Sequence, residues 1–183
     1  MRINLHVIVI GAGLTGSFFL KEMIAYLHMK QENLIRTDIT VFDPGSIGKE
    51  DLGAVYIRED LGQNRVLLLS ELLKEQYDYE VTAVPGDFSV GSPVLQISKR
   101  DYVFMVDCSD GSIPGDYRTE WKKLSAKRKL YLKFADAKLY LDDGSGTEPF
   151  FFKYGREKRR FCLEAFGKNV FGEPCHVKDC GRL

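Results

Sequence analysis

The sequence predicts an α/β protein with a Rossmann-like, doubly wound and mainly parallel sheet, helices on both faces and a short C-terminal extension. Three observations predict this fold. An apolar run over residues 6–10 leads through a glycine-rich turn into a segment with helical spacing. Further apolar runs alternate with segments of helical periodicity, and acidic residues stand at the ends of two of these runs. We expect residues 1–155 to form one domain and residues 156–183 to extend it.

The glycine-rich turn has the spacing Gly-x-Gly-x-x-Gly, formed by Gly11, Gly13 and Gly16. It follows a strand-like run and precedes a predicted helix over residues 18–28, which is the context in which this spacing binds a nucleotide phosphate. Gly11 would allow a sharp turn, Gly13 would let a phosphate approach the backbone, and Gly16 would let helix and strand pack closely. The free N–H groups of the helix N-terminus attract an anion. A glycine turn that binds nothing is the alternative.

The next predicted strand ends in an acidic residue. We expect a polar loop over residues 33–37 and a strand over residues 38–43, which ends at Asp43 before Pro44 and Gly45 break it. A carboxylate at this strand end can accept both hydroxyl protons of a ribose. A solvated strand-end carboxylate is the alternative.

The rest of the chain continues the alternation. Residues 47–65 are too polar and too rich in glycine for one element, so we expect two short turns there and then a helix. The remaining predicted elements are a helix over 63–76, strands over 79–84, 102–106 and 130–134, a helix over 117–127, and a hairpin formed by 137–140 and 150–153.

Three carboxylates are predicted to surround one site. Asp107 and Asp110 follow the strand over residues 102–106, as Asp43 ends the strand over residues 38–43. The carboxyl ends of parallel strands line the crevice that holds a ligand in open sheets. A carboxylate there can also hold Mg²⁺ against phosphate oxygens, because magnesium prefers oxygen ligands.

The composition is that of an ordinary globular domain. Its 26 basic and 26 acidic residues balance, so charge does not indicate a nucleic-acid partner. No apolar run reaches the length of about 20 residues that crosses a membrane, and no signal peptide is expected. The four cysteines do not form a disulfide framework, which indicates a cytoplasmic protein.

Four motifs in order resemble the ThiF/MoeB/HesA family, the bacterial relatives of ubiquitin-activating enzymes, and most of all its short, plasmid- and mobile-element-associated members. The resemblance covers about residues 6–136. The matching motifs are Gly11-Ala12-Gly13-Leu14-Thr15-Gly16-Ser17, Val41-Phe42-Asp43-Pro44 with Ile47, Glu59-Asp60-Leu61-Gly62-Gln63-Asn64-Arg65, and Val106-Asp107-Cys108-Ser109-Asp110.

The resemblance implies ATP-dependent adenylation of the C-terminal carboxylate of a small ubiquitin-like or sulfur-carrier-like protein, with ATP and Mg²⁺ as cofactors. The three glycines would cradle the nucleotide, and Asp43 would hold its ribose. Arg65 would stand where the family has a phosphate-binding lysine, and Asp110 would be the catalytic, magnesium-linked carboxylate. The family also implies a homodimer in which an arginine, here Arg2, reaches the partner's site.

The chain departs from the family pattern after the second strand. The second Asp of the family is Gly45 here, the Asn is Asp51, and an Arg-Gln pair is replaced by Ala54 and Val55. Arg58 lies nearby and would be a substitute cation. These departures leave two readings open, an adenylating enzyme, slightly favoured, or a non-catalytic nucleotide- or protein-binding module. An NAD- or FAD-dependent oxidoreductase is a less favoured third reading.

The C-terminal cysteines carry two further expectations. The family's two Cys-x-x-Cys zinc pairs are missing. The spacing of Cys162, Cys175, His176 and Cys180 is not a recognised zinc spacing, so we expect no zinc site there. Some family members form a thioester on a cysteine beyond the magnesium aspartate, and Cys162 would be that residue here. A buried structural thiol is the favoured alternative for Cys162, and we expect Cys108 to be a packing residue.

Overall fold

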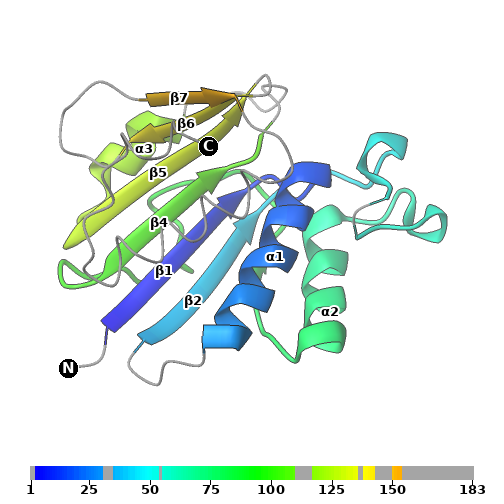
Figure 1. Cartoon of the computed structure of the whole chain (residues 1–183), viewed down its shortest axis with the longest axis horizontal. Coiled ribbons are helices and arrows are strands. Elements are labelled where there is room, and N and C mark those ends of the chain that lie inside the picture. The colour runs from blue at the N-terminus through cyan, green and yellow to red at the C-terminus, as the bar shows by residue number, and fades with distance from the viewer. Residues whose placement is uncertain are drawn as a thin grey trace.

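The computed structural model describes residues 3–30, 35–53, 55–109, 117–135, 138–142 and 150–153. Within these residues the strands form one sheet of order β3-β2-β1-β4-β5-β6-β7 (Figure 1). The strands are β1 (Ile3–Ile10), β2 (Ile35–Phe42), β3 (Thr82–Val84), β4 (Tyr102–Asp107), β5 (Arg128–Ala135), β6 (Lys138–Asp142) and β7 (Phe150–Lys153). The helices are α1 (Leu14–Lys30), α2 (Arg65–Tyr77) and α3 (Tyr117–Lys123), with two 3-10 turns, η1 (Lys49–Asp51) and η2 (Arg58–Asp60).

The first five strands are parallel, in the order β3-β2-β1-β4-β5, and β6 and β7 add an antiparallel hairpin. Ile10 of β1 is in register with Phe42 of β2 and with Asp107 of β4. The carboxyl ends of these three strands therefore meet at one point of the sheet edge. The parallel order, with helices on both faces, confirms the predicted Rossmann-like fold.

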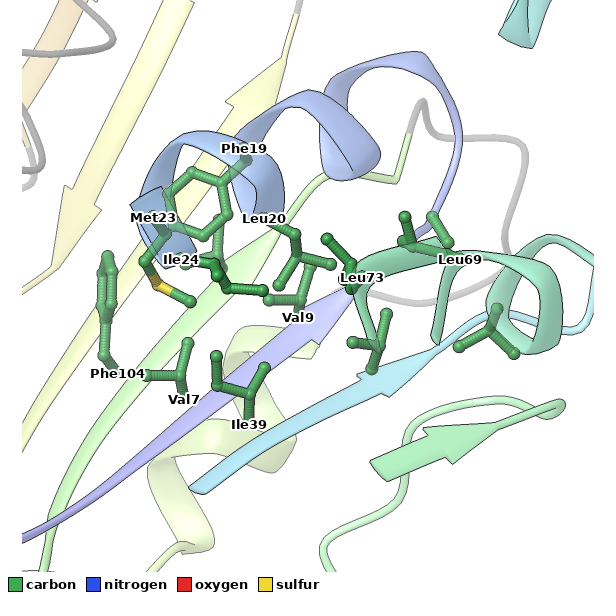
Figure 2. Close-up of a cluster of buried hydrophobic side chains, with 14 of the residues drawn as sticks. Val7, Val9, Phe19, Leu20, Met23, Ile24, Ile39, Leu69, Leu73 and Phe104 are labelled. Atoms are coloured by element: carbon green, nitrogen blue, oxygen red, sulfur yellow. The ribbon is translucent and has the colours of Figure 1, made fainter. Parts of the chain in front are cut away.

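One face of the sheet is covered by α1 and α2, which lie side by side in Figure 1. The α1 residues Phe19, Leu20, Met23 and Ile24 are buried at helical spacing. They belong to a cluster with Val7 and Val9 of β1, Ile39 of β2, Phe104 of β4, and Leu69 and Leu73 of α2 (Figure 2).

The opposite face is covered by α3 and by the segment that follows β3. Ile8 and Ile10 of β1 point to this side, so the central strand is buried on both faces, as parallel strands usually are. The rings of Phe42, Phe88 and Tyr117 follow one another with edge-on contacts, at centroid distances of 5.3 and 5.7 Å. This aromatic series runs from the end of β2 to the start of α3.

Most predicted elements are confirmed, with shifted ends. The polar segment predicted as a loop over 33–37 contains the start of β2, because Ile35 pairs with Ile3 at the start of β1. The predicted helix over 117–127 ends at Lys123, because the backbone N–H of Lys127 donates to the carbonyl of Asp101 and directs the chain into β5. Both predicted turns before α2 are present, as η1 and η2.

One expectation remains outside the structural description. Residues 154–183 lie outside the described part of the chain, so the division at residue 155 stays a prediction. In the described part, no helix combines the length and apolar character needed to span a bilayer.

Candidate functional site

The glycine-rich turn is clamped between the ends of β2 and β4. The N–H of Gly11 donates to the carbonyl of Phe42 at 2.8 Å, and the N–H of Cys108 donates to the carbonyl of Ile10 at 2.8 Å. Gly11 has a φ of +89°, and a Cβ placed on it would lie 3.1 Å from the carbonyl carbon of Cys108. A side chain at this position would meet both backbone strain and the neighbouring strand. Cys108 packs against the core below the turn, as predicted.

Gly16 has the packing role predicted for the third glycine. A Cβ at Gly16 would lie 1.8 Å from the carbonyl oxygen of Gly11, a distance that no side chain could tolerate. Helix α1 begins at Leu14, directly after the turn, and the N–H of Ser17 donates to the carbonyl of Gly13 at 2.9 Å. The first N–H groups of the helix therefore face the space above the turn without an intrahelical acceptor.

Asp43 anchors the turn. One of its carboxylate oxygens accepts a hydrogen bond from the N–H of Ala12 and the other from the N–H of Gly45, both at 2.6 Å. The residue is 1% exposed. Its carboxylate thus fixes the middle of the glycine turn to the end of β2.

Arg65, the first residue of α2, points back toward the same turn. Its Nε donates to Oδ2 of Asp51 at 2.8 Å, and its guanidinium nitrogens lie 3.7 Å from carboxylate oxygens of Asp43 and Glu50. Burial alone would lower the pKa of Arg65. The charges of Asp43, Asp51 and Glu50 outweigh that effect and raise the pKa. Arg65 therefore carries its positive charge at the turn, where it is matched by carboxylates of the same chain.

Asp51 lies directly over the second glycine. It is 3% exposed, and its Oδ2 also accepts a hydrogen bond from the N–H of Gly48 at 2.8 Å. A Cβ placed on Gly13 would lie 2.8 Å from Oδ1 of Asp51. In the sequence Asp51 stood out only as a departure from the family pattern, and its place at the turn was not predicted.

Tyr56 links the glycine turn to the start of α2, and its role was not predicted from the sequence. Its hydroxyl lies 2.7 Å from the carbonyl oxygen of Ala12 and 3.1 Å from that of Arg65, within hydrogen-bonding reach of both. Burial, followed by the charges of Asp43 and Asp51, raises the pKa of Tyr56 well above its ordinary value, so the hydroxyl stays protonated. A tyrosine in a polar loop carries no local signal for this role.

Asp107 ends β4 as a buried, fully engaged carboxylate. It accepts hydrogen bonds from the N–H and hydroxyl of Ser109 and from the hydroxyl of Tyr131, and the Nζ of Lys133 lies 3.3 Å away. Its side chain is 0% exposed. We therefore assign Asp107 to a local network between β4 and β5. Lys133, which sequence analysis did not single out, is the cation of that network.

The predicted gathering of carboxylates is seen only in part. Burial, and then the charges of Asp87, Asp107 and Asp43, raise the pKa of Tyr117. The strand register places the two strand-end carboxylates at the same edge, because Phe42, just before Asp43, and Asp107 are both in register with Ile10. Asp110, the third, lies outside the described residues.

The remaining predicted site residues are placed as follows. Arg58 is exposed in η2, and the side-chain contacts described around the glycine turn do not include it. Arg2, Asp110, Cys162, Cys175, His176 and Cys180 lie outside the described residues. In the part of the chain that the structure covers, no group of three or more His, Cys, Asp or Glu residues is arranged to hold a metal ion.

Comparison with known proteins gives a structural likeness. No protein-family model matches the sequence, and neither does any curated protein. The crystal structure of E. coli MccB with ATP matches with a TM-score of 0.58 at 13% sequence identity, over 93% of this chain and 58% of the MccB chain. The structure of E. coli MccB with selenomethionine MccA matches with a TM-score of 0.50 at 11% identity, over 90% of this chain and 48% of that one.

This likeness shows the fold. At 11% and 13% identity, it shows that this chain has the fold of MccB over about nine-tenths of its own length. The chain spans about half the length of the MccB chains that it matches.

Proposed function

We propose that this chain binds ATP at the glycine-rich turn and adenylates the C-terminal carboxylate of a small protein or peptide. The ubiquitin-like and sulfur-carrier-like proteins of the sequence-based prediction are the candidate partners. One observation carries the proposal: a glycine turn fixed by Asp43 opens onto the N-terminus of α1 at the carboxyl edge of a parallel sheet. Support comes from MccB, which shares the fold and was crystallised with ATP and with MccA.

The residues of the turn would bind and orient the triphosphate. The N–H groups at the start of α1 would donate to phosphate oxygens, and Arg65 would neutralise phosphate charge. A carboxylate oxygen of the partner would then attack the α-phosphorus, forming an acyl–phosphate bond. The bond from the α-phosphorus to the bridging oxygen would break, and pyrophosphate would leave with the electron pair. Such a reaction depends mainly on positioning and on charge stabilisation.

Among the described residues, the carboxylates near the turn that could bind magnesium already have hydrogen-bond or ion-pair partners. Asp43 and Asp51 are engaged by backbone N–H groups and by Arg65, and Asp107 is engaged by Ser109, Tyr131 and Lys133. The magnesium proposal therefore depends on Asp110, and no step above is assigned to the metal.

A specific observation favours the second candidate, a non-catalytic binding module. Arg65 is the only cation described in contact with the turn's carboxylates in the part of the chain that the structure covers, and Asp43, Asp51 and Glu50 surround it. A triphosphate would have to share or take over this charge. Homodimer formation and a zinc-free C-terminus stay as predictions beside either candidate. A thioester on Cys162, the less favoured reading of that residue, belongs to the enzyme candidate alone.

The first test is ATP binding with Mg²⁺, measured by calorimetry on the parent chain, Gly13→Val and Asp110→Ala. We expect micromolar binding by the parent and its loss in both variants. The valine side chain of Gly13→Val would fill the space where a phosphate approaches, and Asp110→Ala would remove the carboxylate proposed to hold magnesium. Gly86→Val is the matched control, since Gly86 lies in a loop where a Cβ would meet nothing within 4 Å. A folded parent that does not bind ATP would contradict the proposal.

Exchange of labelled pyrophosphate into ATP separates the two candidate functions. An adenylating enzyme catalyses this exchange in the presence of its carboxylate partner, whereas a binding module does not. Peptides that end in Gly-Gly with a free carboxylate are the first probes, and the same peptides with a C-terminal amide are the control.

A further inference from the structure

The carboxylate of Asp51 lies against Gly13, the second glycine of the turn. In folds of this class the second glycine of the motif is the point at which the backbone comes close to a phosphate. Here Oδ1 of Asp51 lies 2.8 Å from the position of a Cβ on Gly13. Only 3% of the residue is exposed, so this carboxylate is shielded from solvent.

Arg65 and the backbone N–H of Gly48 hold the carboxylate of Asp51 in this position. Arg65 donates from its Nε to Oδ2 at 2.8 Å, and the N–H of Gly48 donates to the same atom at 2.8 Å. Helix α1, whose N-terminus follows Gly13, has no acidic residue in its first turn. Asp51 supplies the negative charge that favourably interacts with the dipole of this helix. The helix end and Arg65, the two features that would attract a phosphate, therefore both face the same carboxylate.

We propose that Asp51 limits the affinity of the nucleotide site, acting as an internal anion that a phosphate group must displace. On binding, Arg65 exchanges Asp51 for a phosphate oxygen, and the carboxylate moves away from Gly13. The charge of Asp51 thus weakens the binding of polyphosphate and keeps the empty turn ordered. This inference rests on the proposed nucleotide binding and adds to it the residue that limits affinity.

Glu50 provides a matched comparison. It precedes Asp51 in the sequence, and its Oε1 lies 3.7 Å from a guanidinium nitrogen of Arg65. Its side chain, however, is 74% exposed. Water and salt screen an exposed charge strongly. If only the total charge around Arg65 mattered, the loss of either carboxylate would have a similar effect. If the position over Gly13 matters, only the loss of Asp51 strengthens binding.

The experiment measures the dissociation constant of MgATP by calorimetry for the parent, Asp51→Asn, Asp51→Ala and Glu50→Gln, with thermal melting as the check of folding. We expect both Asp51 variants to bind MgATP at least about tenfold more tightly, because a charge-assisted contact no longer competes for Arg65. Glu50→Gln should change the dissociation constant by less than about threefold. The melting temperature of both Asp51 variants should fall in the absence of nucleotide.

The outcomes separate the inference from the proposed function. Equal or weaker binding by both Asp51 variants, with a parent that binds, overturns the inference alone and makes Asp51 a support for Arg65. A gain in Asp51→Asn without a gain in Asp51→Ala also overturns it, because the new amide would then be the cause. An equal gain in Glu50→Gln would do the same by showing a bulk charge effect. A folded parent that does not bind MgATP contradicts the proposed function, and the inference fails as well if the folded Asp51 variants do not bind MgATP either.

Discussion

The three glycines of the turn differ in what a side chain would meet at each position. Gly16 is required by space, because the carbonyl oxygen of Gly11 occupies the position of its Cβ. Gly11 is required by its backbone, which has a φ of +89°. Gly13 has the end of a flexible side chain, that of Asp51, as its contact. Only Gly13 therefore leaves a space that a ligand can enter, after Asp51 has moved.

Gly16→Ala should reduce the free energy of unfolding more than the substitutions proposed at the ligand-binding positions of the turn. The methyl group would have to move the backbone of Gly11, so we expect a loss of about 3 kcal/mol or more in the free energy of unfolding. Urea denaturation followed by circular dichroism measures this loss. Gly86→Ala is the control and should change the value by less than about 1 kcal/mol, because a Cβ there meets nothing within 4 Å. Equal losses in the two variants would contradict the close approach of α1 to the turn.

The sequence could predict the glycine turn but not what lies over it. Spacing and the strand–helix context are local features, so Gly11, Gly13 and Gly16 could be found by reading along the chain. The position of Asp51 depends on how η1 folds back over the start of α1, which no local pattern encodes. Arg65 was predicted to be at the site, whereas its pairing with Asp43 and Asp51 requires three segments to be placed together.

At the scale of elements, a second polar cluster ties β1 to the start of β4 at the edge of the sheet opposite the glycine turn. The carboxylate of Asp101 accepts hydrogen bonds from Asn4 Nδ2 at 3.3 Å and from the N–H of Ser98 at 2.8 Å, and it lies 3.1 Å from Nε2 of His6. Burial alone would raise the pKa of Asp101. The hydrogen bonds from Ser98, Asn4 and His6 outweigh burial and lower the pKa below 3.8.

The lowered pKa of Asp101 predicts a stability difference that depends on pH. A depressed folded-state pKa stabilises the protein fully above the unfolded value of 3.8, and the contribution is lost as pH falls through the lower folded value. Asp101→Asn should therefore lower the free energy of unfolding by about 1–3 kcal/mol near neutral pH, and the difference from the parent should shrink below pH 3.8. Urea unfolding at a series of pH values tests this.

Asp38→Asn is the matched control for Asp101→Asn. Asp38 is also paired on the sheet, with Arg36 at 3.2 Å, but both side chains are largely exposed, at 42% and 63%. An exposed pair contributes about 0–1 kcal/mol, so this variant should change little. A difference between the parent and Asp101→Asn that does not depend on pH would show that the carboxylate charge is not what joins β1 to β4.

The ends of elements were harder to predict than the elements themselves. β3 was predicted over 79–84 but contains only Thr82–Val84, because only Thr40–Phe42 of β2 pairs with it. α3 was predicted to be longer, and the contact from Lys127 to Asp101 ends it earlier. In each case a partner distant in sequence sets the boundary, and hydrophobic periodicity alone carries no information about that partner.

At the scale of the whole molecule, one sheet joins two separate hydrophobic clusters. Val7 and Val9 face the cluster under α1 and α2, and Ile8 and Ile10 face the cluster under α3. Because alternate residues of β1 belong to different clusters, neither can lose its order while the strand is kept intact for the other. We therefore expect the two faces to unfold together.

Leu73→Ala tests this coupling with a reporter on the opposite face. Leu73 is 1% exposed in the cluster under α2, and its truncation should reduce the free energy of unfolding by about 2–5 kcal/mol. Trp121, the single tryptophan of the chain, belongs to α3 and is 1% exposed. Its ring centroid lies 5.7 Å from that of Tyr131. Its fluorescence reports the α3 face, whereas circular dichroism reports mainly α1 and α2, with 17 and 13 residues.

In the parent, the two signals should change at the same urea concentration, and in Leu73→Ala both midpoints should fall by the same amount. Leu67→Ala, on the same helix at a site that is 45% exposed, should leave both midpoints nearly unchanged, because its side chain has less apolar surface to lose. A Trp121 transition that stays at the parent midpoint while the circular dichroism transition shifts would show that the faces unfold independently. Coincident shifts would mean that a change in the α1–α2 layer, which carries the glycine turn, alters the stability of the α3 face through the shared strand β1.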